Sequence, residues 1–244
     1  MRVYIGFDDT DVLGAPIGTG RLVRMFGDDL PSWAKLWGVL RQQLLLDEAI
    51  PFTSHNSSAC AVVEIDQPSR RAALRDLAAR HIATYASDGS DPGLCLVADS
   101  DDLTPLIEFG QDCTHTIRRQ DQALAAALAA GASLEGLGGT NDGIIGAAAA
   151  VGLTAWGWAG RFLEFNRLRD LPRPPTVGDI EAAGIRVMPL GNGVCRLPAS
   201  TFVETKGWVS PRLWGGEAVL PLRRQDEIWQ AVGKRPRDAE VAEG

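Results

Sequence analysis

The sequence predicts a mixed α/β protein, because strand-like and helix-like segments alternate along it at short intervals. Residues 2–7 and 59–65 are rich in β formers and read as strands. Residues 69–86 space their apolar side chains as an amphipathic helix does. We therefore expect an α/β or α+β architecture, and neither an all-α nor an all-β one.

The N-terminal half is predicted to begin with the strand 2–7, which ends at a run of acidic residues. A glycine-rich turn at 12–20 follows. Further strands are expected at 36–41, 59–65 and 94–98, a loop at 44–58, and helices at 21–30, 69–86 and 102–113.

The C-terminal half is predicted to continue with a helix at 120–130 that stops at Gly131. A strand at 133–137, a glycine-rich turn, a helix of small residues and a strand at 160–165 come next. A proline-rich connector leads to a short helix at 176–184 with Thr176 as N-cap, and residues 185–222 alternate strands and turns.

The length of 244 residues, 45% of them hydrophobic, suffices for a core and for two subdomains. We expect a first domain over residues 1–116 and a second over residues 117–232. The charged, apolar-poor segment 233–244 is expected to be a frayed tail.

The net charge is −7, which argues against a general nucleic-acid coat, because phosphate binding needs a broad basic surface. Cys60, Cys95, Cys113 and Cys195 form no CxxC pair, so no zinc ribbon is expected, and they read as buried thiols of a reducing compartment. The chain starts on a strand-like segment and has no long apolar run, so we expect no signal peptide, no membrane span and a cytoplasmic location.

Three carboxylates, Asp8, Asp9 and Asp11, follow the first predicted strand. Clustered oxygen donors suit Mg²⁺, which binds through one or two carboxylates together with phosphate oxygens. The alternative is a polar turn in which the aspartates act as caps.

The segment after these acids carries Gly14, Gly18, Thr19 and Gly20. Small residues let a backbone approach a phosphate closely, although this segment is neither a Walker A loop nor a dinucleotide-binding motif. The alternative is a tight turn before a helix.

Two further polar segments are candidate phosphate sites. His55 and Asn56 precede the strand 59–65, where an imidazole could contact phosphate or carry a proton. A glycine-rich turn opens the small-residue helix, and its free N–H groups would favour an anion. Its candidate residues are Gly138, Gly139, Asn141, Asp142 and Gly143. Solvation of His55, and helix capping by Asn141 and Asp142, are the structural alternatives.

Four segments, in order, resemble the archaeal tRNA-isoleucine agmatidine synthetase family. MRVYIGFDDTD is similar to the family's N-terminal strand and GIDDTDS-like motif, and the loop with Thr19 is similar to its glycine and threonine loop. Arg41, Ile50-Pro51 and residues 52–59 resemble its arginine strand and KTRGNGA segment, and GGTNDGIIGAAAAVG resembles its small-residue helix.

The resemblance implies a kinase-like domain (residues 1–116) packed with a ferredoxin-like domain (residues 117–232), and the use of ATP and Mg²⁺. Asp8, Asp9 and Asp11 would bind Mg²⁺ and ATP phosphates, and Thr19 matches a threonine reported as a phosphorylation site. His55 replaces a basic residue of the family. The family also carries an OB-fold and a zinc ribbon that hold tRNA, so we expect the resemblance to cover the catalytic part alone.

We therefore expect an ATP- and Mg²⁺-dependent phosphotransferase or ligase that activates an RNA base or a small-molecule oxygen, with RNA reached through a partner protein. The alternatives are a non-catalytic nucleotide-binding or scaffold protein, and a small-metabolite kinase. The sequence leaves the oligomeric state open.

Overall fold

The computed structural model describes residues 1–50, 56–191, 193 and 196–232. The chain divides into two compact units. The first comprises Met1–Phe165 and Leu213–Gly216, and the second comprises Asn166–Arg212 and the chain from Glu217 onward. Each unit is described by itself.

The first unit is built on an antiparallel sheet with the strand order β5-β4-β1-β3-β2-β6, and β9 lies next to β6. Its strands are β1 (Arg2–Asp8), β2 (Ala34–Gln43), β3 (Ser57–Ile65), β4 (Gly93–Ala98), β5 (Ser133–Gly136), β6 (Arg161–Glu164) and β9 (Arg212–Trp214). β1 lies in the middle, paired with β3 and β4, so its C-terminal end opens at the centre of one sheet edge.

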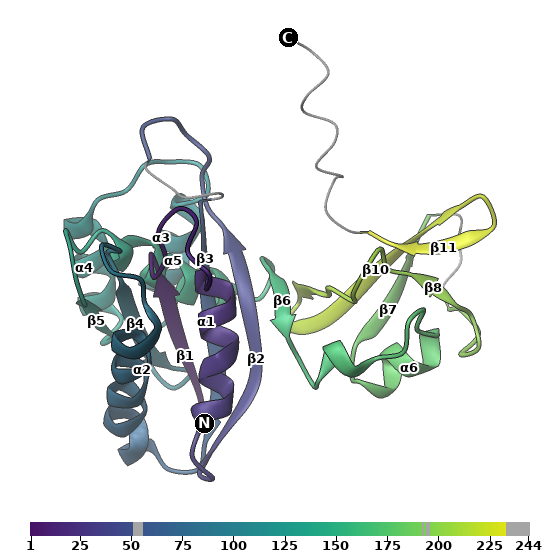
Figure 1. Cartoon of the computed structure of the whole chain (residues 1–244), viewed down its shortest axis with the longest axis horizontal. Helices are drawn as coiled ribbons and strands as arrows, with labels where there is room; N and C mark the ends of the chain where they lie inside the picture. Colours follow the sequence, from purple (N-terminus) through teal and green to yellow (C-terminus); the bar gives the residue numbers. More distant parts are fainter. Residues whose placement is uncertain (51–55, 192, 194–195, 233–244) are drawn as a thin grey trace. The chain divides into compact units, whose positions relative to one another are not determined.

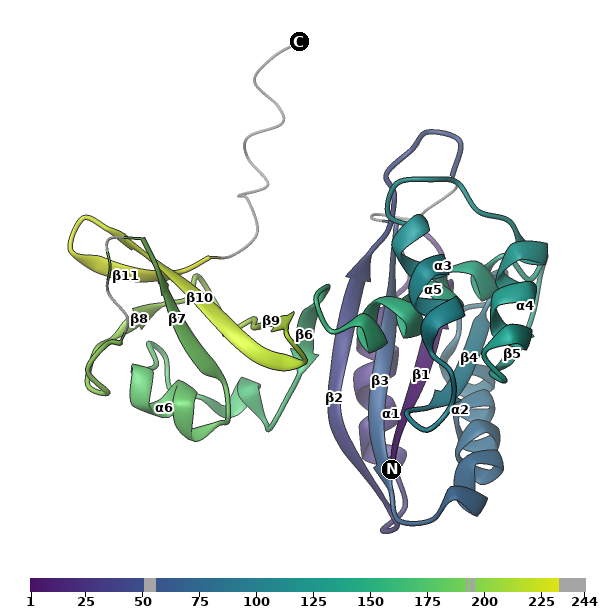
Figure 2. The same cartoon turned by 180° about the vertical axis from the view of Figure 1, so that it is seen from behind.

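Helices cover both faces of this sheet. α1 (Thr19–Phe26) and α2 (Arg71–Tyr85) lie on the face shown in Figure 1. α3 (Thr104–Asp112), α4 (Gln120–Ala129) and α5 (Gly143–Trp156) lie on the face shown in Figure 2. The alternation of β1 explains the two layers, because Val3, Ile5 and Phe7 join the core formed with α1 and α2.

α5 packs directly on β1, β3 and β4, and glycines make this approach possible. A Cβ at Gly6 would overlap the carbonyl oxygen of Ala147, and a Cβ at Gly93 would overlap the backbone of Gly143. The residues of α5 from Gly146 to Thr154 are all buried. The small-residue helix expected from the sequence is therefore a close-packed helix.

The described residues of the second unit form a short α-helix and four strands: α6 (Val177–Ala182), β7 (Arg186–Leu190), β8 (Val203–Glu204), β10 (Glu217–Gln225) and β11 (Ile228–Ala231). β10 and β11 form an antiparallel hairpin, and β7 and β8 add to it in parallel on β10 and β11 respectively. Thr176 caps α6 as expected, because its Oγ1 accepts a hydrogen bond from Asp179 N at 3.2 Å.

The mixed α/β class is confirmed, and the structure has a strand or helix at each position where the sequence predicts a definite one. The sequence predicts a domain boundary between residues 116 and 117, and the structure places the boundary elsewhere. β5 and α5 follow that point in the sequence, yet they pack with β4 and β1 in the first unit, so the chain divides at Phe165 instead. The assignment of kinase-like and ferredoxin-like parts stays a prediction.

A buried histidine was not expected. His81 lies on α2 and is 3% exposed. Its Nδ1 lies 2.6 Å from Asp29 Oδ2 and its Nε2 lies 2.9 Å from Leu22 O. His81 therefore joins α2 to α1 and the turn that follows. The expected tail, residues 233–244, lies outside the described residues.

Candidate functional site

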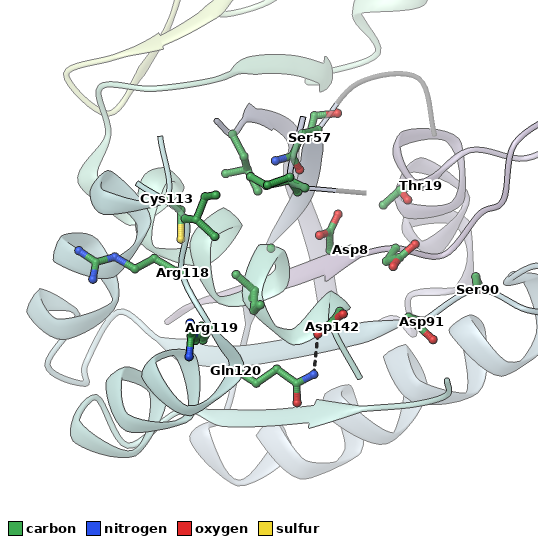
Figure 3. Close-up of a pocket in the computed structure, with 18 of the residues that line it drawn as sticks. Asp8, Thr19, Ser57, Ser90, Asp91, Cys113, Arg118, Arg119, Gln120 and Asp142 are labelled. Atoms are coloured by element: carbon green, nitrogen blue, oxygen red, sulfur yellow. Dashed lines mark hydrogen bonds between the residues drawn. The ribbon is translucent and has the colours of Figure 1, made fainter. Parts of the chain in front are cut away.

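A cavity of about 830 Å³ opens at the edge of the sheet where β1 ends. Its described lining comes entirely from the first unit, and Figure 3 shows it with its acidic and basic side chains. Segments far apart in the sequence contribute: the end of β1, the start of α1, the loops around residues 44–57 and 89–91, the segment 113–121 and the start of α5. The volume lies in the range of sites for nucleotide-sized ligands.

β1 delivers the acids to this cavity. Asp8 is the last residue of the strand and is partly buried, and Asp9 follows with φ = 50°. Aspartate adopts this left-handed conformation more readily than most residues with a Cβ, and here it turns the chain sharply at the end of the strand. The turn allows Asp8, Asp9 and Asp11 all to line the same cavity.

Asp11, Thr19 and Thr10 form a hydrogen-bonded chain. The Oδ1 of Asp11 accepts from Thr19 N at 3.1 Å and from Thr19 Oγ1 at 2.9 Å. Thr19 Oγ1 accepts in turn from the hydroxyl of buried Thr10 at 3.0 Å. These hydrogen bonds join the two ends of the loop of residues 12–18 and hold the first turn of α1 beside the acids.

Asp91 is a cavity residue that no sequence motif indicates. It precedes β4, and its carboxylate accepts from Thr140 N at 2.8 Å and from Thr140 Oγ1 at 2.6 Å. Its carbonyl oxygen accepts from Gly143 N at 3.1 Å. A single aspartate in a loop carries no sequence signal, and only the pairing of β4 with β1 brings it to the site.

The turn before α5 contributes Asp142. Its Oδ1 accepts from Gln120 Nε2 at 2.6 Å, the bond drawn in Figure 3. Gln120 also donates to Thr140 O at 2.9 Å, so the start of α4 is tied to the start of α5. Six carboxylates, those of Asp8, Asp9, Asp11, Asp91, Asp121 and Asp142, line one cavity among the described residues.

This arrangement raises the pKa of two of the carboxyls. The pKa of Asp8 rises to about 7, chiefly because burial disfavours its charged form and also because Asp9 and Asp11 are near. The pKa of Asp9 rises to about 6, from burial and from the charges of Asp91, Asp11 and Asp142. A bound cation would relieve both effects, and perturbed carboxyls in a cavity indicate a functional site.

Gly146 makes room for Asp8. A Cβ at Gly146 would overlap the Oδ2 of Asp8, so the first turns of α5 can lie against that carboxyl only when this residue has no side chain. The glycine that the sequence presents as part of a small-residue helix is thus also part of the site.

The structure brings together some of the expected site residues and separates others. Those that line the cavity are Asp8, Asp9, Asp11, Thr19, Asn56 and Asp142. Those that do not are Gly14, Gly18, Gly20, Gly138, Gly139, Asn141 and Gly143. Gly20 instead faces the side chain of Leu163, whose Cδ1 would lie 2.8 Å from a Cβ at this position. His55 lies outside the described residues.

Asn56 lines the cavity but already has a structural role. Its side-chain amide donates to Leu45 O at 2.7 Å, and its carbonyl oxygen accepts from Leu44 N at 3.0 Å. Cys113 also lines the cavity, and burial raises the pKa of its thiol to about 12, which makes it unsuited to act as a nucleophile.

No group of three or more His, Cys, Asp or Glu side chains in the described part of the chain is arranged to hold a metal ion by itself. The acids nevertheless suit Mg²⁺ bound to a phosphate ligand, because that ion takes one or two carboxylates and fills its other positions with phosphate and water oxygens. Among the same residues, no helix is long and apolar enough to cross a membrane.

The fold and the cavity define a mixed α/β domain with an acid-lined cavity at the end of a central strand. No protein-family model matches the chain, and no curated protein matches it either. Solved structures do match its fold.

The chain resembles TiaS, an agmatidine synthetase of isoleucine tRNA. It is 26% identical to TiaS in a complex with tRNA and ATP, with a TM-score of 0.54, over 62% of this chain and 36% of that chain. The complex of TiaS with tRNA, AMPCPP and agmatine gives 26% identity and a TM-score of 0.53, with the same coverage. Apo TiaS, at 24% identity and a TM-score of 0.50, supports the fold alone. The match spans just over a third of the TiaS chain.

Proposed function

We propose that this chain is an ATP- and Mg²⁺-dependent phosphotransferase or ligase. One observation carries the proposal: Asp8, Asp9 and Asp11 meet Thr19 in one cavity of about 830 Å³, within a fold similar to that of TiaS, of which an ATP complex is known. Catalysis of phosphoryl transfer consists almost entirely of positioning and charge stabilisation, which such a site can provide.

The acids supply the oxygen donors for the metal ion. Asp8 and Asp9 would face it from the end of β1. Mg²⁺, when bound, would offset the charge on the β- and γ-phosphates. Because both carboxyls have raised pKa values, they gain from a nearby cation more than exposed aspartates would.

Thr19 supplies a hydroxyl beside the acids as the proposed phosphoryl acceptor. Its Oγ1 lies 2.9 Å from Asp11 Oδ1, to which it donates. In a transfer to Thr19, the bond from the γ-phosphorus to the bridging oxygen breaks, a bond to Oγ1 forms, ADP leaves, and the hydroxyl proton passes to Asp11. Thr19→Val would remove this acceptor, whereas Thr19→Ser would keep it.

Calorimetric titration of ATP with and without Mg²⁺ tests the proposal. We expect Mg²⁺-dependent binding by the wild type and at least tenfold weaker binding by Asp8→Asn, about the loss of one charge-assisted contact. An absence of ATP binding, or equal binding of Mg-ATP by Asp8→Asn, would refute it.

Apart from Thr19 itself, the acceptor substrate of the proposed enzyme is an RNA base or a small-molecule oxygen. Similarity to TiaS in a complex with tRNA supports RNA, reached with a partner protein. Salt separates the two cases: affinity for an RNA falls steeply with salt concentration because phosphate contacts release counterions, whereas affinity for a neutral metabolite does not. Titration of tRNA transcripts at about 50 and 200 mM salt makes the comparison.

A non-catalytic nucleotide-binding protein is the second candidate. The hydrogen bonds among Thr10, Asp11 and Thr19 favour it, since they also serve to cap α1. ATP turnover with a candidate acceptor that is lost in Asp9→Ala would exclude this second function. Binding of ATP with no turnover in the presence of tRNA or small acceptors would support it.

A further inference from the structure

Two arginines stand opposite each other on neighbouring strands of the first unit. Arg41 of β2 is paired in register with Arg161 of β6. Arg41 follows the core residue Val39 by two positions, and Arg161 precedes Leu163, which faces Gly20 of α1, by two positions. Because side chains alternate along a strand, both arginines leave the sheet on the face that carries α1. Like charges directly opposite each other are destabilising, so this pair favours an anion nearby.

Arg41 is half-buried without an acidic partner. Its Nε donates to the neutral Oγ of Ser57 at 2.9 Å, and burial lowers the pKa of its guanidinium. In the part of the chain that the structure describes, no carboxylate pairs with Arg41, whereas Arg71 of the same unit pairs with Asp101. Because a guanidinium has five N–H donors, most of those of Arg41 remain for an anionic ligand.

Ser57 connects the arginine pair to the candidate site. It is the first residue of β3, and it lines the cavity together with Thr19 and the acids of β1 (Figure 3). Arg41 is not among the described lining residues, so its hydrogen bond to Ser57 places it at the margin of the cavity. The proposed Mg-ATP lies at Thr19 and the acids, and an anion at Arg41 therefore belongs to a second ligand.

We propose that Arg41, beside Arg161, binds a phosphate group of the acceptor substrate. A guanidinium matches two phosphate oxygens at once. The chain has a net charge of −7, so a phosphate-bearing acceptor gains from a local pair of basic side chains. An RNA strand and a phosphorylated metabolite both present such a group. This inference rests on the proposed function and adds to it the group by which the acceptor is recognised.

The test compares Arg41→Gln with the wild type by calorimetry in Mg²⁺ and AMPCPP. The probes are a short single-stranded RNA and ribose 5-phosphate. We expect the variant to bind one probe about tenfold more weakly, the loss of one charge-assisted contact. A loss for the RNA identifies a phosphodiester of a strand, and a loss for ribose 5-phosphate identifies a phosphorylated metabolite. In the RNA case, the slope of log affinity against log salt concentration should also fall by about one.

Two further variants make the comparison specific. Arg41→Lys keeps the charge but not the paired donors, so an intermediate loss is expected. Arg80→Gln, at an exposed position on α2 away from the cavity, is the matched control and should bind both probes as the wild type does. Circular dichroism verifies that each variant is folded, and Arg41→Lys carries the test if Arg41→Gln is not.

The affinity for Mg-ATP separates this inference from the proposed function. Equal binding of both probes by the wild type and Arg41→Gln, or a wild type that binds ATP but neither probe, would overturn the assignment. A loss of ATP binding in Arg41→Gln as large as that in Asp8→Asn would also overturn it, because Arg41 would then belong to the nucleotide site. A wild type that binds no ATP would overturn the proposed function itself.

Discussion

The carboxyl of Asp8 lies at the end of a central strand, against a helix and beside two other aspartates. Its pKa of about 7 lies above the usual value of 3.8, so the folded protein holds this proton more tightly than the unfolded chain does. The ionised carboxylate of Asp8 therefore lowers the free energy of unfolding of the ligand-free protein. A bound cation would stabilise this carboxylate.

Asp8→Asn should stabilise the free protein at alkaline pH while weakening nucleotide binding. The penalty from Asp8 is absent below about pH 4, grows between pH 4 and 7, and is complete above pH 7. The variant should thus gain about 1–3 kcal/mol at pH 8, allowing for partial solvent screening, and nothing at pH 4. Urea unfolding at both pH values measures this difference. The control Asp28→Asn, at an exposed position, should leave the free energy of unfolding unchanged at both pH values. An equal gain for Asp8→Asn at pH 4 would contradict the explanation.

Gly146→Ala tests the fit between α5 and Asp8. The new methyl group would overlap Asp8 Oδ2, so the side chain or the helix must move, at a cost of about 1–3 kcal/mol. We expect lower stability and weaker binding of Mg-ATP. Gly138→Ala is the control, because its Cβ would come no nearer than 3.4 Å to Pro92. Similar losses in both variants would show that Gly146 has no special role.

At the scale of elements, α5 connects the site to the sheet. Its first turn faces the acids, and its body lies on β1, β3 and β4 at a distance that only glycines permit. The contact between α5 and the sheet therefore holds both the acids of β1 and the turn that contains Asp142. A change in the packing of α5 should displace both.

Gly6→Ala should disrupt this contact. The added Cβ would overlap the carbonyl oxygen of Ala147 in the backbone of α5, which cannot rotate away as a side chain can. We expect a loss of about 3 kcal/mol or more in the free energy of unfolding. Circular dichroism during urea unfolding measures it. A stability within about 0.5 kcal/mol of the wild type would mean that α5 is packed less closely.

At the scale of the whole molecule, the cavity belongs to the first unit, and its described lining falls between Asp8 and Gly146. The second unit has nine basic and seven acidic residues within its described range, whereas the whole chain has 24 and 31. The acidic balance therefore lies in the first unit, which also contains the proposed metal and nucleotide site.

A fragment of residues 1–165 should retain nucleotide binding with reduced stability. It keeps the described lining of the cavity but lacks β9, which lies next to β6 and belongs to the first unit. Calorimetry of Mg-ATP on the fragment, with circular dichroism to verify folding, tests this expectation. A folded fragment that binds no ATP while the full chain does would contradict it.

Local patterns in the sequence were sufficient for the elements and for part of the site. Asp8, Asp9, Asp11 and Thr19 lie within 12 residues of each other, so one strand and one turn bring them together. The cap at Thr176 and the close-packed α5 also follow from local chemistry, because helix capping and small-residue packing depend on short spacings.

Long-range pairing decided the rest. Asp91 reaches the acids because β4 pairs with β1, and Arg118 and Arg119 reach the same cavity from the segment between α3 and α4. The domain division also depends on which strands share a sheet, a property that no local pattern encodes. The sequence by itself determined the mixed class and the acidic strand end. Only the tertiary structure decided that six acids and two arginines line one cavity, because contacts between distant segments arise from the packing of the whole sheet.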